Sequence, residues 1–485
     1  MHLVLQGVFM KLKKILSGIK VLNAKDIKNV NIENISNKTS DSLTNGLYIC
    51  LKGEKFDGHY LKEDALNKGA IAFVVEKLDE NFSGNQILVD DCRTALAVIA
   101  KNFYGKIPKI IGITGTNGKT TTTNMVAHIL KTANKKVGLI GTEGVFFNEQ
   151  KINLHMTTPD PIELFKILAQ MKKEKIEYAV MEVSAHAIFL KKVSAINFCV
   201  KALTNITEDH LDFFKTLENY QNTKIDFFST SKGIKIVNID DKYGCKIASK
   251  FKKVFTYSCI IPSDATANRI INYGKNFDVK LNGKKLQVQT NLIGNYNVQN
   301  ALCAMLICKK LGIKTNMIIS ALKTFDAVEG RLNVYKNGDK MAIIDFAHTP
   351  DALNNVLTTL KQVTTGKLIC LFGCGGNRES EKRPIMGEVA SKICDYTFIT
   401  SDNPRFEEPE FIANEIVKGI KTKNYHVELD REKAIVMASD MLSDGDCLAI
   451  CGKGAEDYIE IKGIKYPYCD KDVLIKLGFE KRISV

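Results

Sequence analysis

A glycine-bearing segment between residues 109 and 132 constrains the fold of this chain more than any other stretch. Apolar residues over 110–113 predict a buried strand, a turn with two glycines follows, and apolar residues then recur at helical spacing. Strand, turn and helix in this order form the context of a phosphate-binding loop, because backbone N–H groups and the helix N-terminus then face the anion. The sequence therefore predicts a nucleotide phosphate site made of Gly115, Thr116, Asn117, Gly118, Lys119, Thr120 and Thr121.

Two side chains of this loop suit the chemistry of a nucleotide. The Lys119 ammonium supplies a positive charge for the phosphates, and the Thr120 hydroxyl can ligate Mg²⁺. The commonest spacing of such loops has a glycine where Ile113 stands, so the pattern here is Gly115-x-x-Gly118-Lys119-Thr120. A structural Gly-rich turn is the alternative, but the strand, loop and helix signals all favour nucleotide binding.

The length and composition of the chain bound its class. At 485 residues it is long enough for about three domains. Its 45% hydrophobic and 25% charged residues are ordinary for a soluble globular protein, and no apolar run approaches the roughly 20 residues that span a bilayer. We therefore expect no membrane insertion. Residues 1–9 lack the charged-then-apolar order of a signal peptide, so we interpret them as an extension, with Met10 as an alternative start.

The spacing of the cysteines and the net charge limit which metal ions, disulfides and binding partners are expected. The 13 cysteines are scattered without a paired CxxC spacing, which favours reduced thiols in a cytoplasmic protein over zinc ligands or a disulfide framework. The net charge of +14 suits an anionic partner, but lysine is spread along the whole chain. No basic cluster interleaved with aromatic residues stands out, so we expect no nucleic acid partner. We also expect a monomer.

Before the phosphate loop, residues 11–105 predict a small α/β domain. Strands are expected over 46–51 and 70–75, and helices over 60–68 and 93–103. The segment from Tyr104 to Pro108 then breaks the pattern and marks a domain boundary.

After the loop, three polar side chains stand out beside apolar runs. Glu182 is the last residue of an expected strand, and a carboxylate there suggests a role in binding a metal ion or ordering a water molecule. The alternative is a buried carboxylate that pairs with a lysine. His210 lies among acidic residues after another strand, as metal ligands often do. Lys224 lies on an expected helix over 217–228; its residues alone favour an ammonium extended into water over a carbamate formed with CO₂.

From residue 332 onward the pattern predicts a third, doubly wound α/β domain. Four apolar strands, over 341–344, 367–372, 396–400 and 447–450, are each followed by a polar loop, and most of these loops lead into a helix. Such sheets bind ligands in a crevice at the carboxyl ends of their strands. The full GxGxxG pattern is absent, so a nicotinamide cofactor is not expected.

These motifs together resemble the Mur ligase family, the ATP-dependent ligases that form amide bonds in peptidoglycan precursor synthesis. The resemblance covers nearly the whole chain from about residue 11 onward. The motifs that carry it are Gly115 to Thr120, Met181 to Ser184, Thr204-Asn205 with Asp209 to Asp212, Gly294 to Asn300, and Asp345-x-Ala347-His348-Thr349-Pro350.

The resemblance implies three domains, namely a UDP-muramoyl-binding domain over 11–105, an ATP-binding domain over 106–331 and an amino-acid-binding domain over 332–485. It implies ATP and Mg²⁺ as cofactors and Lys119, Glu182, His210 and Lys224 as catalytic residues. Thr120 and Glu182 are the implied ligands of one Mg²⁺, and His210 and carbamylated Lys224 are those of a second; the spacing from Asp209-His210 to Lys224 matches the family. The implied nucleotide contacts beyond the loop are Asn300, Arg331, Asp345 and His348. The implied contacts to UDP-MurNAc-L-Ala-D-Glu are Thr39, Glu54, Lys55, Phe56, Thr157, Thr158, Ser184 and Lys192.

Within the family, the segment from Asp402 to Arg405 is similar to the signature of enzymes that add meso-diaminopimelate. The implied amino-acid contacts are Arg378, Asp402, Asn403, Pro404, Arg405, Gly452 and Glu456. The planar Arg405 guanidinium can bind the distal carboxylate of diaminopimelate in bidentate fashion, with two parallel hydrogen bonds, and Glu456 can face the distal ammonium. Lysine lacks that carboxylate and would leave Arg405 unpaired.

The chain also departs from the family pattern, at Ala185, Leu190, Lys192, Ala455, Lys471 and the segment Lys38-Thr39-Ser40. A close analogue with the same two heads, such as lanthionine, satisfies the same residues as diaminopimelate. The alternatives are a lysine-adding or other ligase of the family, a folylpolyglutamate synthetase-like ligase, a P-loop kinase, and a nucleotide-binding scaffold without ligase activity.

Overall fold

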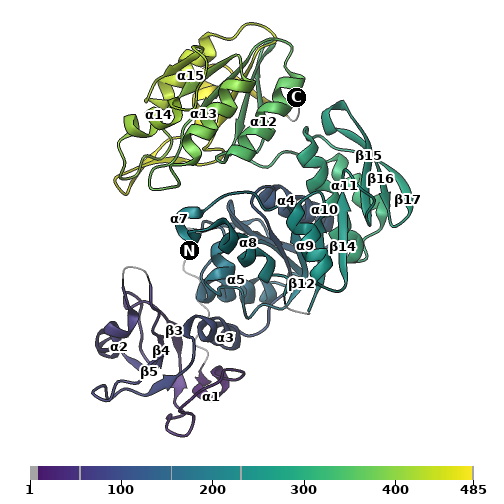
Figure 1. Ribbon diagram of the computed structural model, residues 1–485. Helices are drawn as coiled ribbons and strands as arrows, with labels where there is room; N and C mark the ends of the chain where they lie inside the picture. Colours follow the sequence, from purple (N-terminus) through teal and green to yellow (C-terminus); the bar gives the residue numbers. More distant parts are fainter. Residues whose placement is uncertain (1–8, 54–55, 155, 230–231, 483–485) are drawn as a thin grey trace. The chain divides into compact units, whose positions relative to one another are not determined.

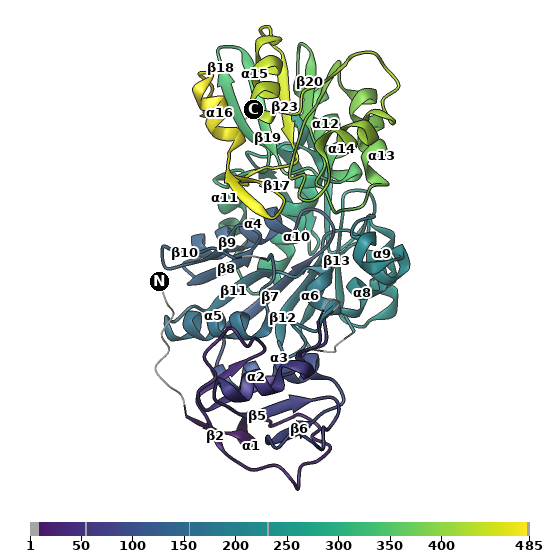
Figure 2. The same cartoon turned by 90° about the vertical axis from the view of Figure 1, so that its left-hand side faces the viewer.

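The computed structural model describes residues 9–53, 56–154, 156–229 and 232–482. Its contacts divide the chain into two compact units: the first holds the chain up to residue 112 together with 136–199, and the second holds 113–135 together with residues from 200 onward. Figures 1 and 2 show the elements of both units, which we describe one at a time. Among the described residues, no helix is both long and apolar enough to cross a bilayer.

The first unit begins with a four-stranded parallel sheet, on which the predicted N-terminal strands and helices are found. Its strands lie in the order β3 (Asn34–Ser36), β4 (Gly46–Ile49), β5 (Ala70–Val75) and β6 (Gln86–Leu88). Figure 1 labels α2 beside these strands, and α2 contacts β5. The remaining elements of this part are β1 (Met10–Lys11), α1 (Leu12–Ile15), β2 (Asn31–Ile32), η1 (Gly58–Leu61), α2 (Lys62–Asn67) and α3 (Cys92–Tyr104).

The rest of the first unit carries the strand that ends in Glu182. Strand β11 (Tyr178–Glu182) runs parallel to β8 (Val137–Gly141), and the hairpin of β9 (Gly144–Phe147) and β10 (Gln150–Ile152) extends β8 in antiparallel fashion. Two helices accompany these strands, α5 (Pro161–Lys173) and α6 (Ala185–Phe189). Helix α5 begins with Pro161 at its first turn, as predicted, but Asp160 at its N-cap makes no capping bond, because its carboxylate pairs with Lys192 at 2.8 Å.

The second unit opens at the end of β7 (Lys109–Thr114) with helix α4 (Lys119–Thr132). Its first strands are β12 (Phe198–Leu203), β13 (Ile234–Asn238), β14 (Val254–Ser258) and β15 (Ala265–Ile271), which pair in parallel, and β16 (Asn276–Leu281) and β17 (Lys284–Gln289), which are antiparallel. The helices are α7 (Leu211–Phe214), α8 (Leu217–Asp226), α9 (Lys242–Lys250), α10 (Asn295–Lys310) and α11 (Thr315–Lys323), with the short turn η2 (Asn272–Gly274).

Helix α10 is buried along most of its length and contacts α4, β13, β14 and β15. The helix begins at Asn295, directly after Gly294, whose φ of +94° suits glycine. Polar side chains of the first turns find partners within or just before the helix, since Asn297 Nδ2 donates to Ile293 O at 2.8 Å and Asn300 Nδ2 to Asn297 Oδ1 at 3.1 Å.

A seven-stranded sheet forms the rest of the second unit and confirms the predicted doubly wound α/β fold. Four strands run parallel to one another, β19 (Lys340–Asp345), β20 (Leu368–Phe372), β21 (Tyr396–Ile399) and β23 (Cys447–Cys451), and β22 (Tyr425–Val427) joins them. The strand order is β22-β21-β20-β23-β19-β18-β26, where β18 (Asn333–Asn337) and β26 (Glu480–Arg482) are antiparallel at one edge. The hairpin of β24 (Tyr458–Ile461) and β25 (Ile464–Pro467) lies apart as its own small sheet.

Helices cover both faces of this sheet (Figure 2). Alternate strand residues such as Leu368, Cys370 and Phe372 form one core with α12 (Pro350–Val363), α13 (Lys382–Ile393) and α14 (Pro409–Val417). Residues between them, such as Ile369 and Leu371, form the other core with α15 (Arg431–Asp440) and α16 (Asp470–Lys476). Burial on both faces explains why these strands are continuous apolar runs in the sequence.

Candidate active site

The predicted phosphate loop has the conformation that its glycines allow. Gly115 has a φ of +154°, and Gly118, which precedes α4, has a φ of +82° in the left-handed region. A methyl group on Gly115 would collide with the hydroxyl of Thr204, and one on Gly118 with the amide oxygen of Asn300. The N-terminus of α4 therefore stands open toward the loop, in the arrangement that binds anions.

Side chains around the loop hold its shape. Thr116 N donates to Asn205 O at 2.9 Å, and Asn117 N donates to Asn205 Oδ1 at 2.9 Å. Lys119 Nζ donates to the carbonyl oxygens of Gly115 and Thr116 at 2.8 Å each, so the ammonium lies back over the loop. Thr120 and Thr121, at the start of α4, are also buried.

Replacing Gly118 with alanine tests the loop's role. A residue with a Cβ pays about 1–2 kcal/mol for the left-handed conformation, and here the methyl also displaces Asn300. We expect the affinity for ATP to fall at least about 10-fold, measured by calorimetric titration. Gly312→Ala is the matched control, because Gly312 has a φ of +87° with open space around it. Equal ATP affinity in both variants would contradict the assignment.

The other predicted nucleotide residues gather near the end of β19. Arg331 Nη2 donates to Thr120 Oγ1 at 3.3 Å, and the Arg331 guanidinium stacks on the ring of Phe346 at 4.3 Å. Asn300 Oδ1 accepts from Thr122 Oγ1 at 3.2 Å, close to Gly118. Asp345 is nearly buried, and its carboxylate is taken up by the backbone N–H groups of Leu332 and Ala347 at 2.8 Å each. Nucleotide contacts by these residues stay predictions.

His348 also follows β19 and is held as a neutral ring. Its Nδ1 lies 2.9 Å from the carbonyl oxygen of Phe346, which can only accept, so Nδ1 carries the proton and Nε2 is the unprotonated nitrogen. The pKa of His348 is lowered to about 4, first by burial and then by the nearby Lys382.

This low pKa predicts a pH dependence of stability. An unfolded histidine titrates near pH 6.5, so between about pH 6.5 and 4 the unfolded chain binds a proton that folded His348 does not. Stability is therefore lost as the pH falls through this window. We expect the melting temperature to fall more steeply from pH 6.5 to 4 in the wild type than in His348→Asn. Parallel curves would contradict the prediction.

The structure brings His210 and Lys224 together around the ring of Tyr220. Lys224 Nζ lies 4.4 Å from the Tyr220 ring centroid and 3.4 Å from Thr116 Oγ1, while the His210 ring centroid lies 6.2 Å from that of Tyr220. Lys224 is 1% exposed, so the ammonium does not reach water as the bare sequence had suggested. The pKa of Lys224 lies well below its usual value, first because of burial and then because of the positive charge of Lys119.

These residues fit a divalent cation only if Lys224 becomes an anion. Among the described residues, no group of three or more His, Cys, Asp or Glu side chains is placed to hold a metal ion. A buried, neutral amine can add CO₂ to give a carbamate, which supplies the oxygen ligands that Mg²⁺ prefers. His210 Nε2 is already near a carboxylate, Asp209 Oδ2, at 3.3 Å.

In the first unit, Glu182 lies with three of the residues predicted to bind the muramoyl substrate. The Glu182 carboxylate accepts hydrogen bonds from Thr142 N at 3.0 Å and Thr142 Oγ1 at 3.2 Å. Thr142 Oγ1 in turn lies 3.1 Å from Thr157 Oγ1. Thr158 Oγ1 donates to Glu182 O at 2.9 Å and accepts from Ser184 N at 3.1 Å. Among the described residues the Glu182 carboxylate is therefore held by Thr142, and it forms no ion pair with a lysine, which was the alternative.

The remaining predicted muramoyl contacts lie elsewhere in that unit. Lys192 is buried in its ion pair with Asp160. Thr39 and Phe56 lie on loops of the four-stranded N-terminal part, where Thr39 O accepts from Lys68 Nζ and the Phe56 ring is exposed. Glu54 and Lys55 lie outside the described residues.

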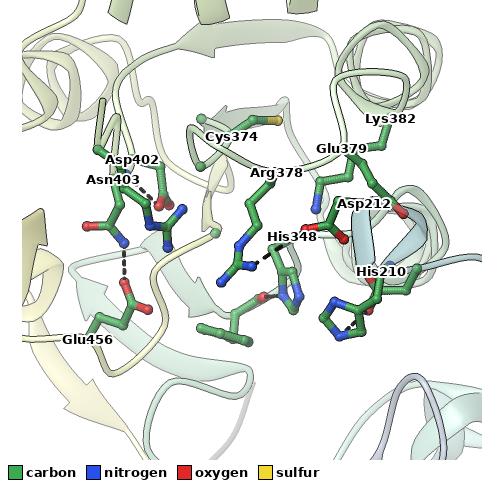
Figure 3. A pocket seen from close by; sticks show the side chains of 16 residues that line it. His210, Asp212, His348, Cys374, Arg378, Glu379, Lys382, Asp402, Asn403 and Glu456 are labelled. Atoms are coloured by element: carbon green, nitrogen blue, oxygen red, sulfur yellow. Dashed lines mark hydrogen bonds and ion pairs between the residues drawn. The ribbon is translucent and has the colours of Figure 1, made fainter. Parts of the chain in front are cut away.

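A pocket opens where the strands of the seven-stranded sheet end (Figure 3). Its lining comes from the segments after β19, β20, β21 and β23 and from the turn before α7, and it includes six of the seven predicted amino-acid contacts. These six are Arg378, Asp402, Asn403, Arg405, Gly452 and Glu456. Pro404 lies between Asn403 and Arg405, and its carbonyl oxygen accepts from Glu407 N at 3.0 Å.

On one side of this pocket, Asn403 connects two charged groups. Asn403 Nδ2 donates to Glu456 Oε2 at 2.9 Å (Figure 3). Lys453 Nζ donates to both Asn403 Oδ1 at 3.2 Å and Glu456 Oε2 at 3.1 Å. Gly452, with a φ of +108°, leaves room for the Asp402 carboxylate, which a methyl group there would approach to 2.8 Å.

The Arg405 guanidinium closes the same side. Its Nη1 donates to Gly376 O at 2.7 Å and its Nε donates to Glu460 Oε2 at 3.2 Å, with about a fifth of each side chain exposed. Gly375 allows this approach, because a methyl group there would lie 2.8 Å from Arg405 Nη1.

On the other side, Arg378 points toward Asp212, with Nη1 3.7 Å from Asp212 Oδ2 (Figure 3). The neighbouring Glu379 accepts a hydrogen bond from Leu211 N. The pKa of Glu379 is raised to about 7, first by burial and then by Asp209.

The prediction from sequence missed several residues that line the pocket or hold its lining. Those in the lining are Asp209, Asp212, Phe346, Gly373, Cys374, Gly375, Glu379 and Lys382, and those behind it include Lys453 and Glu460. Most of the first group follow strand ends, so treating every polar residue after a strand as a candidate would have found them.

Comparison with known proteins now identifies the family. Residues 31–104, 113–308 and 330–454 match the Mur ligase family catalytic domain, the Mur ligase middle domain and the Mur ligase glutamate ligase domain. The chain is 40% identical over 479 residues to UDP-N-acetylmuramoyl-L-alanyl-D-glutamate–2,6-diaminopimelate ligase 1 of Clostridium acetobutylicum, covering 96% of this chain and 98% of that one.

Solved structures agree with this comparison. A UDP-N-acetylmuramoyl-L-alanyl-D-glutamate–2,6-diaminopimelate ligase superposes with a TM-score of 0.70 at 26% identity, covering 97% of this chain and 98% of that one. A MurF ligase of Thermotoga maritima, solved with ADP, shares the fold with a TM-score of 0.62 at 20% identity over 86% of this chain and 93% of that one. The chain described here belongs to the Mur ligase family.

Proposed function

We propose that this chain joins meso-2,6-diaminopimelate to the D-Glu γ-carboxylate of UDP-MurNAc-L-Ala-D-Glu, with cleavage of ATP to ADP and phosphate. The observation that carries the proposal is the Arg405 guanidinium in the pocket lining. Two of its five N–H groups donate to Glu460 and Gly376, and the other three form no hydrogen bond with the described residues. A distal carboxylate is the natural partner for that fork, and Glu456 stands nearby for the distal ammonium. The names of the relatives at about 40% identity support the same substrates.

The reaction takes place in two steps. An oxygen of the γ-carboxylate attacks the γ-phosphorus of ATP, the bond to the β–γ bridging oxygen breaks, and ADP leaves, so that an acyl phosphate forms. The amine of diaminopimelate, having lost one ammonium proton, then attacks the acyl carbon. The C–O bond to phosphate breaks, the attacking nitrogen gives up a second proton, which the phosphate takes up as it leaves, and the amide is complete. Two anions meet in the first step, which is why positive charge must gather at the phosphate loop.

Residues of the chain divide this work. The loop from Gly115 to Thr121 and the N-terminus of α4 bind the phosphates, and the Lys119 ammonium turns from its carbonyl partners toward them. Arg331 and His348 contact the nucleotide. Asn300 shapes the phosphate loop, and Asp345 shapes the end of strand β19. Thr157, Thr158, Ser184 and Lys192 hold the muramoyl dipeptide, and Thr39, Glu54, Lys55 and Phe56 lie toward the uridine.

Mg²⁺ is the proposed cation: Thr120 and Glu182 would hold one ion, and His210 and carbamylated Lys224 would hold a second. When bound, it neutralises phosphate charge and orients the phosphoryl group. Carbamylation balances simply: the neutral Lys224 amine adds to CO₂, the new N–C bond forms, and one proton is released. Burial of Lys224 favours this, because it keeps the amine uncharged.

The three predicted domains take these roles in order, with residues 11–105 for the UDP-muramoyl part, 106–331 for ATP and 332–485 for the amino acid. We further propose that the enzyme acts as a monomer in the cytoplasm, where peptidoglycan precursors are built for cell wall growth and division.

Phosphate release tests the proposal. The purified protein is given ATP, Mg²⁺, UDP-MurNAc-L-Ala-D-Glu and diaminopimelate, and each component is omitted in turn. We expect phosphate only when all are present. ATP turnover without the amino acid would indicate a kinase or ATPase, absence of turnover under all conditions would indicate a scaffold, and equal rates with lysine would indicate a lysine-adding ligase.

A further inference from the structure

The hairpin of β24 and β25 stands outside the seven-stranded sheet, yet it is bound to the loop that carries Arg405. Arg405 N donates to Glu460 O at 3.0 Å, and Lys462 N donates to Arg405 O at 2.6 Å, so the backbone of Arg405 is bonded on both sides to strand β24 and the residue that follows it. Arg405 has a φ of +53°, a conformation that costs energy for a residue with a side chain. The bridge to β24 therefore holds a strained residue in place.

The Glu460 side chain adds a second connection to the same residue. Glu460 Oε2 accepts from Arg405 Nε at 3.2 Å, while Gly376 O accepts from Arg405 Nη1 at 2.7 Å. These two acceptors lie on different edges of the guanidinium and fix its plane. Both Arg405 and Glu460 are mostly buried, so the pair is less screened than one on the surface.

Glu460 is itself anchored in the network behind the pocket. Glu460 N donates to Asn403 Oδ1 at 2.9 Å, and the same oxygen accepts from the buried Lys453. Glu460 does not line the pocket, so it reaches a ligand there only through Arg405.

We propose that Glu460 is a positioning residue that sets Arg405 for the distal carboxylate of the amino-acid substrate. The inference rests on the proposed function. The carboxylate of Glu460 holds Nε, which leaves the outer N–H groups of the guanidinium for the substrate. Because the effect passes through Arg405, it concerns only amino acids with a distal carboxylate.

Kinetics of three single variants test this inference. Glu460→Ala removes the acceptor, and we expect the KM for diaminopimelate to rise about 10-fold with kcat changed less than about 2-fold. The KM values for ATP and the muramoyl dipeptide stay unchanged. Glu460→Gln keeps an oxygen acceptor for Nε and restores the KM to within about 2-fold. Glu432→Ala is the matched control: Glu432 pairs with Lys476 at the same 3.2 Å but lies outside the pocket lining, and we expect wild-type kinetics.

A double-mutant cycle separates positioning from a general structural role. In an Arg405→Ala background, Glu460→Ala has no further effect on kcat/KM for diaminopimelate, because the group that it orients is gone. Additive losses, a rise in all three KM values, or an unchanged KM for diaminopimelate in Glu460→Ala would overturn the inference.

Failure of the proposed function is visible separately. If the wild type itself shows no phosphate release that depends on diaminopimelate, both the proposed function and this inference are overturned. If the wild type uses diaminopimelate and only the comparison of variants fails, the inference alone is overturned.

Discussion

Arg405→Ala should lower kcat/KM for meso-diaminopimelate by about 100- to 1,000-fold, which corresponds to about 3–4 kcal/mol of lost binding. The magnitude follows from the loss of two charge-assisted hydrogen bonds to one carboxylate, each worth about 1.5–3 kcal/mol. Water that enters the space of the side chain replaces part of these interactions, so the net loss is smaller than their sum. In the variant, the distal carboxylate of the substrate would lose water beside the negatively charged Glu456 with no Arg405 cation to pair with, which disfavours binding.

Two further measurements interpret that result. Arg405→Lys keeps the charge but loses the planar fork, so we expect an intermediate loss of about 10- to 100-fold. Activity with L-lysine, however small in the wild type, should not fall in Arg405→Ala, since lysine offers nothing for Arg405 to bind. A diaminopimelate kcat/KM within a few-fold of wild type would contradict the role of Arg405.

Lys224→Met should abolish ligase activity, with kcat reduced more than about 100-fold, because the variant removes a proposed ligand of the metal itself rather than a residue that only contacts such a ligand. The same variant should be as stable as the wild type or more stable. A methionine fills similar space without placing an amine in a fully buried site, where the pKa of Lys224 shows that its charge is disfavoured.

Lys201→Met provides the matched control for that variant. Lys201 is also buried, its pKa is lowered to about 8 by burial, and its Nζ donates to Phe227 O at 2.7 Å rather than facing the phosphate loop. We expect Lys201→Met to retain ligase activity. Carbon-13 NMR with labelled bicarbonate should show a carbamate signal in the wild type and in Lys201→Met but not in Lys224→Met. Full activity in Lys224→Met would contradict the proposed metal site.

Much of the fold could be predicted because local patterns agree with the final structure. The strands of the C-terminal sheet are apolar runs because both faces of the sheet are buried. The phosphate loop is recognisable because its glycines stand where the backbone is left-handed or where another group approaches too closely for a side chain. The partners of Asn297 and Asn300 in the first turns of α10 are not visible in the sequence, because these contacts exist only once the helix has formed.

The site could be predicted only in part, for a physical reason. Residues that follow strands, such as His348 and Asp402, gather at one edge by topology alone. The partners of Arg405 and Asn403 depend on long-range contacts, so Lys453 and Glu460 carried no local signal. The burial of Lys224 depends on how the phosphate loop and Tyr220 cover it, which its own helix does not reveal.

The most direct test of the account is the mass of the product. The enzyme is given ATP, Mg²⁺, UDP-MurNAc-L-Ala-D-Glu and an equimolar mixture of meso-diaminopimelate and L-lysine, and the uridine-containing product is analysed by mass spectrometry. The account predicts a product heavier than the substrate by diaminopimelate minus one water, with the lysine adduct a minor species. A product carrying mainly lysine, or a uridine substrate left unchanged while ATP is consumed, would contradict it.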